Sequence, residues 1–483
     1  MLSIVGRVPD KNQDALLRKQ DTCNLARIPL DRNNVIPVRD KALDVTVKNP
    51  AKAGDSQSLR AEIAAQFADI KAFLSALPAS ARWFHIFYLL GPLFLLIERS
   101  PADFWLSLCG IVFFGRSIVV HDWGWLRHFW VRACLMFWAV CLLSSALSSL
   151  PAYSLGEAFV WIRFPLFAFA SCFWLAKSRQ MVIAMMGMTA LGMVIMTGIL
   201  TAEILIVGQQ GGRLSWPYGD LVPGNYLAKA GLPAFCVLVA LAVSDKRPVN
   251  SLAAIVSFIT ITLSVVTGER INFLIRACGG MLAGLVWRPK FSRYAVLVLI
   301  ELLAVVTVFF AAPTIGNRFI DKFIEELPTQ NESSYYRVMH SGLAAFDTAP
   351  ILGIGTGNYR IMCPDIMQEL AENACHPHPH NYYIQMLAET GAAGLLFGCM
   401  MIGAILWKTG KTSWQGRSHV ITATAVIVPL GFFFPLQSTA DFFGQWNNIF
   451  MWSAIGLVLA AGNLLYAHSN RDSKAALPEN RVK

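Results

Sequence analysis

The sequence predicts an all-α polytopic membrane protein with about 12 transmembrane helices. Only 14% of its 483 residues are Asp, Glu, Lys or Arg, about half of the roughly 25% found in an average soluble domain. Hydrophobic residues make up 55% of the chain and gather into long blocks, which is typical of a chain solvated by lipid. These observations exclude a large water-soluble enzyme.

The N-terminal part of the chain is expected to lie outside the membrane. Residues 1–55 contain charges of both signs and no sustained apolar run, which predicts a disordered tail. In residues 56–80, apolar side chains from Leu59 to Leu77 recur at spacings of three and four. This pattern predicts an amphipathic helix at the membrane interface. The first apolar block begins near residue 83, too late for a cleavable signal peptide, so we expect it to remain as an anchor.

Windows of about 20 residues, the length that crosses a bilayer, select twelve apolar blocks. Nine of them fall within residues 83–313 and three within residues 391–467. The blocks lie near residues 83–98, 103–120, 128–150, 158–177, 180–208, 223–244, 249–267, 271–288, 293–313, 391–408, 418–437 and 447–467.

Basic residues gather in every second connection between these blocks, whereas the opposite short connections hold only Arg99, Arg213 and Arg270. By the positive-inside rule, both chain ends, including residues 468–483, then lie in the cytoplasm, and the long loop of residues 314–390 faces the periplasm. The net charge of +10 is therefore interpreted as a topology signal, and no nucleic-acid partner is expected.

The loop of residues 314–390 is expected to be functional, since long insertions in compact proteins usually are. Within it, Pro350–Asn358 contains four closely spaced small residues, which favour a tight turn. A phosphate cradle is the less favoured alternative, because the Lys and Ser/Thr of a nucleotide P-loop are missing. Cys363 and Cys375 lie twelve residues apart in a segment assigned to an oxidising compartment, so they are a disulfide candidate whose geometry the sequence leaves open.

Three histidines alternate with proline in His376-Pro-His378-Pro-His380-Asn381. Alternating histidines suggest a metal site. However, His-Pro repeats favour a polyproline helix with three residues per turn, in which successive side chains diverge by about 240°. No nearby Cys or carboxylate pattern completes a standard site, so neither a metal nor another cofactor is expected.

His380 has a more specific predicted place, at the N-terminus of a helix. Pro379 suits the first helical turn, and the run that starts at Asn381 has helical spacing. The helix dipole there disfavours imidazolium and keeps the ring neutral, as a general base requires. The residues alone leave a second interpretation open, a polar loop histidine that only caps the helix.

Two arginines are expected near the outer interface, Arg213 after the fifth block and Arg270 between the seventh and eighth. Because the outer face carries little positive charge, topology gives no reason for them to be there. Arg276 follows six residues later, about 9 Å deeper along a helix. Planar guanidinium groups suit the bidentate capture of phosphate.

These features together resemble the bacterial O-antigen ligase family. The resemblance covers most of residues 83–467 and includes the Pro-x-x-Gly-x-Gly-x-Gly-Asn turn at Pro350–Asn358. Its most specific part is His380-Asn381 followed, after nine residues, by Gly391-x-x-Gly394. The resemblance implies that His380 is catalytic. It also implies that outer-face arginines bind the diphosphate of an undecaprenyl-linked glycan, a role that carries over to Arg213 and Arg270.

The implied activity is an inverting, metal-independent glycosyl transfer from undecaprenyl diphosphate to a hydroxyl of lipid A-core. It would take place among membrane lipids, at the periplasmic face of the bacterial inner membrane, in lipopolysaccharide biosynthesis. We add Arg276 to the diphosphate-binding set and give Asn381, His378 and Glu269 supporting roles. Relatives often have Ser-x-Ser-Arg-Gly where this chain has an acid, Glu269, which we expect to pair with Arg270.

Three alternatives remain open at this stage. A polysaccharide polymerase and a protein O-oligosaccharyltransferase share the chemistry of the ligase. A transporter of lipid-linked glycans belongs to a different class, and its charged residues would line a path across the bilayer.

Overall fold

A computed structural model describes residues 55–219, 223–244, 247–287, 291–325, 333–369 and 375–465. The predicted tails, residues 1–55 and 468–483, lie outside the described residues except for Asp55. Over the described ranges, the regular secondary structure is entirely helical, apart from an isolated bridge between Gln210 and Arg213. The all-α class is therefore confirmed.

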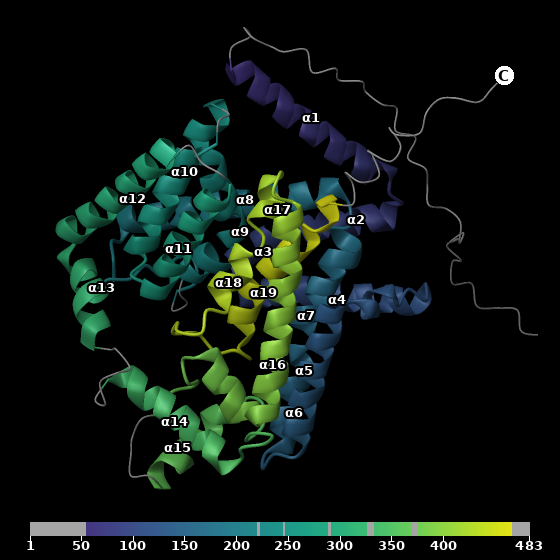
Figure 1. Ribbon diagram of the computed structural model, residues 1–483, viewed down its shortest axis with the longest axis vertical. Coiled ribbons are helices and arrows are strands. Elements are labelled where there is room, and N and C mark those ends of the chain that lie inside the picture. The colour runs from purple at the N-terminus through teal and green to yellow at the C-terminus, as the bar shows by residue number, and fades with distance from the viewer. Residues whose placement is uncertain are drawn as a thin grey trace, which may run out of the picture. The chain divides into compact units, whose positions relative to one another are not determined.

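The helices follow one another along the chain, most of them with short connections (Figure 1). The first half comprises α1 (Asp55–Ala76), α2 (Ala79–Leu89), α3 (Gly91–Ile97), α4 (Arg99–Val119), η1 (Gly124–Arg127), α5 (Phe129–Ala146), α6 (Pro151–Trp161), α7 (Arg163–Ala170), η2 (Ser171–Leu175) and α8 (Arg179–Ile206). The second half comprises η3 (Tyr226–Ala230), α9 (Leu232–Ala242), α10 (Arg247–Val266), α11 (Arg270–Val286), α12 (Phe291–Ala311), α13 (Pro313–Glu325), α14 (Ser334–Thr348), α15 (Tyr359–Glu369), α16 (Tyr382–Gln415), α17 (Val420–Ala423), α18 (Ile427–Phe432) and α19 (Gln445–Ala460).

Seven helical segments among the described residues are long and apolar enough to cross a membrane, or eight if the bent pair α2 and α3 forms one span. The predicted count of twelve is thus not confirmed. The segments that pass are α4, α5, α8, α12, α16, the continuous stretch Pro151–Leu175 and the stretch Gln445–Leu465.

Most of the missing spans are apolar segments whose helices are short or broken. The block near 223–244 contains the five-residue π-turn η3 and then α9, which has 11 residues and reaches only about 17 Å. The block near 418–437 is divided between α17 and α18. Hydropathy averaged over a window detects the apolar composition of such segments, but it does not register where the helical hydrogen bonding is interrupted.

The core of the bundle lies around α19, whose residues from Asn447 to Ala460 are all buried. This helix packs against α7 and α4, while α16 packs along α5. The predicted 314–390 loop contains α13, α14, α15 and the first turns of α16. Figure 1 shows α14 and α15 together beside one end of α16. The outward position of this loop, and the position of α1 at a membrane surface, stay predictions.

Candidate functional site

A cavity of about 280 Å³ brings together segments that are far apart in the sequence. We call it the basic cavity. His380, Arg213 and Arg270 all contribute to its wall, as do the supporting residues His378 and Glu269. The rest of the wall consists of Asn225, Lys229, Gly268, Ile271, Asn272, Ile275, Arg318, Tyr335, Tyr382, Phe432, Gln437, Ser438, Thr439 and Ala440.

His380 is fixed to the connection between α18 and α19 at two points. The Thr439 N–H donates to the His380 carbonyl oxygen at 2.7 Å, and His380 Nδ1 lies 3.2 Å from the Thr439 carbonyl oxygen. A carbonyl oxygen can only accept, so this contact requires the proton on Nδ1. In the neutral ring, Nε2 then has the lone pair, which is the arrangement that a general base needs.

The backbone of His380 is left-handed, with φ of 55°. This conformation costs a non-glycine residue roughly 1–2 kcal/mol, and it persists where neighbouring structure imposes it. The helix cap is the next residue, Asn381, whose Oδ1 accepts from Tyr383 N at 3.0 Å and Ile384 N at 3.2 Å. His380 therefore precedes the cap of α16 by one residue and does not cap the helix itself.

The three histidine rings lie close together, so the expectation that they diverge is wrong. The ring centroids of His378 and His380 are 4.4 Å apart, and those of His376 and His380 are 5.6 Å apart. The segment bends at 377, 378 and 380, so it does not extend as a polyproline helix. Burial, followed by the neighbouring His380, lowers the pKa of His378 from its ordinary value, which favours a neutral ring. Among the described residues, no group of three or more His, Cys, Asp or Glu side chains is arranged to hold a metal ion.

Arg213 is paired with Glu269, the two side chains lying 3.3 Å apart from Nε to Oε1. We expected this acid to pair with Arg270, its neighbour in the sequence. Burial raises the pKa of Glu269, and Arg213 opposes that shift. The guanidinium of Arg213 remains half exposed, at 51%, so it can still contact a ligand.

The wall of the basic cavity includes two further cations, Lys229 and Arg318. Sequence analysis did not assign either of them to the site. Lys229, only 7% exposed, donates to Asn447 Oδ1. Arg318 on α13 donates from Nε to the Gly268 carbonyl oxygen at 2.9 Å. The sequence signal for Lys229 was its position inside an apolar block, where an unpaired charge is costly; Arg318 had no comparable signal. With Arg213 and Arg270, four cations and one carboxylate, that of Glu269, are among the described residues of the cavity wall, a composition that suits a polyanionic ligand.

The structure does not bring Arg276 to the basic cavity. Its side chain is fully buried, Nη1 donates to the Leu227 carbonyl oxygen at 2.8 Å, and the guanidinium lies 4.0 Å from the centroid of the Phe235 ring. A carbonyl and an aromatic face contact this cation, and its Nε is buried without a hydrogen-bond partner. Its position does not support the predicted role in binding diphosphate.

Comparison with known proteins identifies the part of the chain that contains most of these residues. Residues 253–399 match the family described as O-antigen ligase. The matched region includes Arg270 and His380, whereas Arg213 and Thr439 lie outside it.

The other comparisons add little to this assignment. No curated protein matches the chain. A solved structure titled "Structural coordination of polymerization and crosslinking by a peptidoglycan synthase complex" is similar at 17% identity, with a TM-score of 0.42, over 71% of this chain and 98% of that chain. A likeness at this level carries no argument about function.

Within residues 253–399, the glycine-rich turn is bound to a break in α16. Gly391 interrupts that helix with φ of 66°, and the N–H groups of Ile354 and Gly355 donate to the carbonyls of Ala388 and Glu389 at 3.0 and 2.9 Å. Glu389 Oε2 also accepts from Gly357 N at 2.8 Å. Because a carboxylate already occupies this N–H, the segment acts as a structural turn and not as a phosphate cradle.

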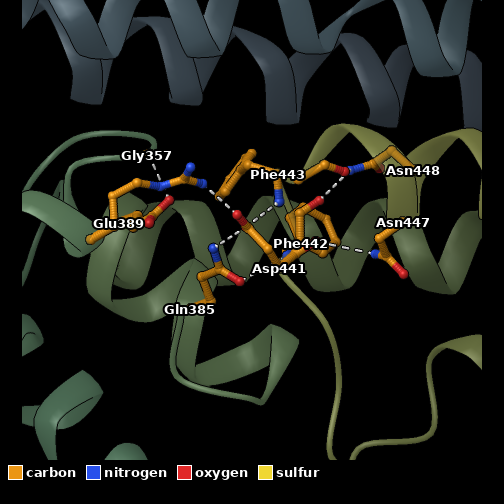
Figure 2. A network of polar contacts seen from close by, with 10 residues as sticks. Gly357, Gln385, Glu389, Asp441, Phe442, Phe443, Asn447 and Asn448 are labelled. Carbon is orange, nitrogen blue, oxygen red and sulfur yellow. Dashed lines mark hydrogen bonds and ion pairs between the residues drawn. The ribbon is translucent and has the colours of Figure 1, made fainter. Parts of the chain in front are cut away.

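Asp441 connects residues of the matched region 253–399 to the segment before α19 (Figure 2). Sequence analysis did not single out this residue. Its Oδ1 accepts from Gln385 Nε2 at 2.6 Å and from Phe443 N at 3.0 Å, and its Oδ2 pairs with Arg360 Nη2 at 2.5 Å. Gln385 Oε1 in turn accepts from Phe442 N at 2.8 Å. Burial alone would lower the pKa of Arg360, but Asp441 together with Tyr153, Glu389 and Glu157 raises it on balance. This network fixes the segment that contains Thr439 against α15 and α16.

The sulfur atoms of Cys363 and Cys375 form a disulfide, with their Cα atoms 5.8 Å apart. Cys375 directly precedes His376, so the bond ties the histidine segment to α15.

Proposed function

We propose that this protein transfers a glycan from a lipid diphosphate to a hydroxyl group of an acceptor saccharide. In its specific form, the donor is undecaprenyl diphosphate-linked O-antigen and the acceptor is lipid A-core. The observation that supports this proposal most directly is that His380, Arg213 and Arg270 share the wall of one cavity. The match of residues 253–399 to the O-antigen ligase family supports the same class of reaction.

The reaction needs a general base for the acceptor hydroxyl group and positive charge beside the leaving diphosphate. His380 Nε2 takes the proton of the acceptor hydroxyl, and the acceptor oxygen forms a bond to the anomeric carbon of the donor glycan. The bond from that carbon to the diphosphate oxygen breaks, and its electron pair leaves with the undecaprenyl diphosphate. Attack from the side opposite the leaving group inverts the anomeric centre. Imidazole as a general base contributes about 10²- to 10⁴-fold to such a step.

The cations of the basic cavity bind the leaving diphosphate. Arg213 and Arg270 offer planar donors that match phosphate oxygens, and Lys229 and Arg318 raise the positive potential around them. Charge that develops on the diphosphate oxygen as the bond breaks is therefore stabilised by groups already in place. The basic residues of alternate connections support a location in the bacterial inner membrane, with this site on the periplasmic side.

The test is a gel of lipopolysaccharide from a strain that lacks the gene. Loss of all long-chain material, with carrier-linked polymer retained, is the expected result. A core bearing a single repeat unit would assign a polymerase instead, and unchanged lipopolysaccharide would overturn the proposal.

Complementation with variants identifies the base. The wild-type gene and a His340→Ala control, which alters a histidine outside the cavity wall, should restore long-chain lipopolysaccharide. His380→Ala should accumulate at normal levels in the membrane and fail to restore it. Full restoration by His380→Ala would remove the proposed base.

A further inference from the structure

A second cavity of about 1110 Å³ adjoins the basic cavity. The two share Asn225, His378 and Ala440 in their walls. The larger cavity exceeds the roughly 300–1,000 Å³ that hold most small ligands. It lies between α4, α6, α7 and α19, and no role assigned so far uses it.

The charges of the second cavity balance, in contrast to those of the basic cavity. Three cations on its wall face three carboxylates, and two of the cations are held in ion pairs. Arg163 Nε lies 2.9 Å from Asp103 Oδ1, and Arg360 Nη2 lies 2.5 Å from Asp441 Oδ2. We therefore call it the neutral cavity. The cations are Arg99, Arg163 and Arg360, and the carboxylates are Asp103, Glu157 and Asp441. A diphosphate would find no excess of positive charge here, so its place is the basic cavity.

Three side chains on the wall of the neutral cavity carry buried hydrogen-bonding atoms that the protein leaves unmatched. Within the described part of the chain, Trp161 Nε1, Trp446 Nε1 and His378 Nε2 are buried and have no hydrogen-bond partner. Trp161 is only 1% exposed. An indole N–H is a donor only, and leaving a buried donor unmatched is unfavourable. A bound molecule with many oxygen atoms would supply the acceptors.

The remaining groups of the wall fit a saccharide. Asp103 Oδ2 accepts from Gln445 Nε2 at 2.7 Å, and a carboxylate has about four lone-pair sites, so capacity remains for sugar hydroxyl groups. Trp446 and Phe450, whose ring centroids are 4.3 Å apart, add apolar surface for the C–H faces of a sugar ring.

We propose that the neutral cavity binds the acceptor saccharide, while the basic cavity binds the diphosphate of the donor. This inference rests on the proposed transferase function. Inverting attack requires the acceptor oxygen to approach from the side opposite the diphosphate. His378, whose ring lies 4.4 Å from that of His380, belongs to both walls, so an acceptor in the neutral cavity reaches the base across this residue.

The test uses the full-length protein in lipid nanodiscs, with undecaprenyl diphosphate-linked glycan as donor and purified lipid A-core as acceptor. Trp446→Phe removes an unmatched N–H and keeps an aromatic ring. We expect the KM for lipid A-core to rise about three- to tenfold, the equivalent of one hydrogen bond, with the KM for the donor unchanged. Trp161→Phe should act in the same way if it remains folded. Trp407→Phe, a change at a 75% exposed tryptophan, is the matched control.

Two outcomes would overturn the inference while the transferase function stands. In the first, the wild-type protein transfers glycan, but Trp446→Phe raises the KM for the donor and not the KM for the acceptor. This result would assign the neutral cavity to the donor glycan. The other is an unchanged acceptor KM in both tryptophan variants. A wild-type protein with no transfer would instead overturn the proposed function.

A binding measurement separates the two questions. Calorimetry with core oligosaccharide, released from lipid A by mild acid, requires no turnover. Binding to wild type that weakens about three- to tenfold in Trp446→Phe supports a saccharide site in the neutral cavity, whether or not transfer is observed. Equal binding by wild type and Trp446→Phe contradicts it.

Discussion

His380 and Thr439, 59 residues apart in the sequence, are joined by a backbone hydrogen bond of 2.7 Å and a ring-to-carbonyl contact of 3.2 Å. The first contact holds a left-handed residue in place, and the second selects the imidazole tautomer. The segment between α18 and α19 therefore orients the proposed base.

Replacing Thr439 by proline tests this orientation. Thr439→Pro removes the N–H that donates to the His380 carbonyl oxygen, so the ring should lose its fixed direction. We expect kcat to fall about 10- to 100-fold, within the range that a misplaced general base can cost, while the donor KM changes little. Thr439→Ala keeps the N–H and should lose much less. Equal kcat values for the two variants would show that the backbone bond does not position His380.

The two arginines of the basic cavity should affect the chemical step strongly. Arg270→Ala and Arg213→Ala each remove a donor from the leaving diphosphate, and loss of one such donor typically costs about 10²- to 10³-fold in kcat. Lysine in either position restores charge without the planar fork, so recovery should be partial. The kinetics of purified variants check this expectation. Arg337→Ala, a change at an exposed arginine on α14 outside the cavity walls, is the control, and a similar loss there would refute the assignment.

Two glycines in α16 provide a matched test of the helix break at Gly391, where the Pro350–Asn358 turn is hydrogen-bonded to the helix. A Cβ on Gly391 would lie 2.3 Å from the Ile351 carbonyl oxygen, and its φ is +66°, whereas a Cβ on Gly403 meets nothing within 4 Å. Gly391→Ala should lower the thermal midpoint by several degrees, because strain of more than about 1 kcal/mol is added. Gly403→Ala should raise it slightly or leave it unchanged. Similar midpoints for the two variants would argue against a structural role for the break.

Protonation of His378 should reduce stability at mildly acidic pH. Burial and His380 lower the pKa of His378 from 6.5 to about 4. Between these values the unfolded chain binds a proton that the folded chain does not, so stability falls as the pH drops from about 6.5 toward 4. In thermal melts, His378→Gln should lose less stability than wild type between pH 7.5 and pH 5. Parallel losses would mean that His378 is not held neutral.

The disulfide between Cys363 and Cys375 should be present in protein taken from intact cells. Peptide mapping under non-reducing conditions should recover the two cysteines in one linked species. A link across this short loop contributes about 2–3 kcal/mol, so Cys363→Ser should lower the thermal midpoint. Two free thiols in the native protein would contradict both the pairing and the outward position predicted for this loop.

The helical class was predictable from the apolar blocks, and the grouping of His380 with Arg213 and Arg270 was predictable from the alternation of basic connections together with the family resemblance. Apolar blocks reveal a membrane protein, and an arginine in a connection poor in positive charge stands out. Other partners became visible only through tertiary contacts. Thr439 and Asp441 lie in an ordinary polar connection, and nothing in the sequence shows that this connection packs against α16.

Arg276 does not line the basic cavity, for a geometric reason. It was placed by depth along the helix, but six residues correspond to a rotation of about 240° around the axis. Arg276 therefore leaves α11 on a different face from Arg270 and meets Leu227 and Phe235. The count of twelve spans is not confirmed, and hydropathy does not reveal the π-turn η3 or the division of α17 from α18.

The measurement that tests the central claim most directly is a cryo-electron microscopy structure of the protein with undecaprenyl diphosphate-linked glycan. The account predicts the diphosphate between Arg213 and Arg270, with the anomeric carbon of the first sugar facing His380. A diphosphate bound away from both arginines, or an anomeric carbon out of reach of His380, would contradict it.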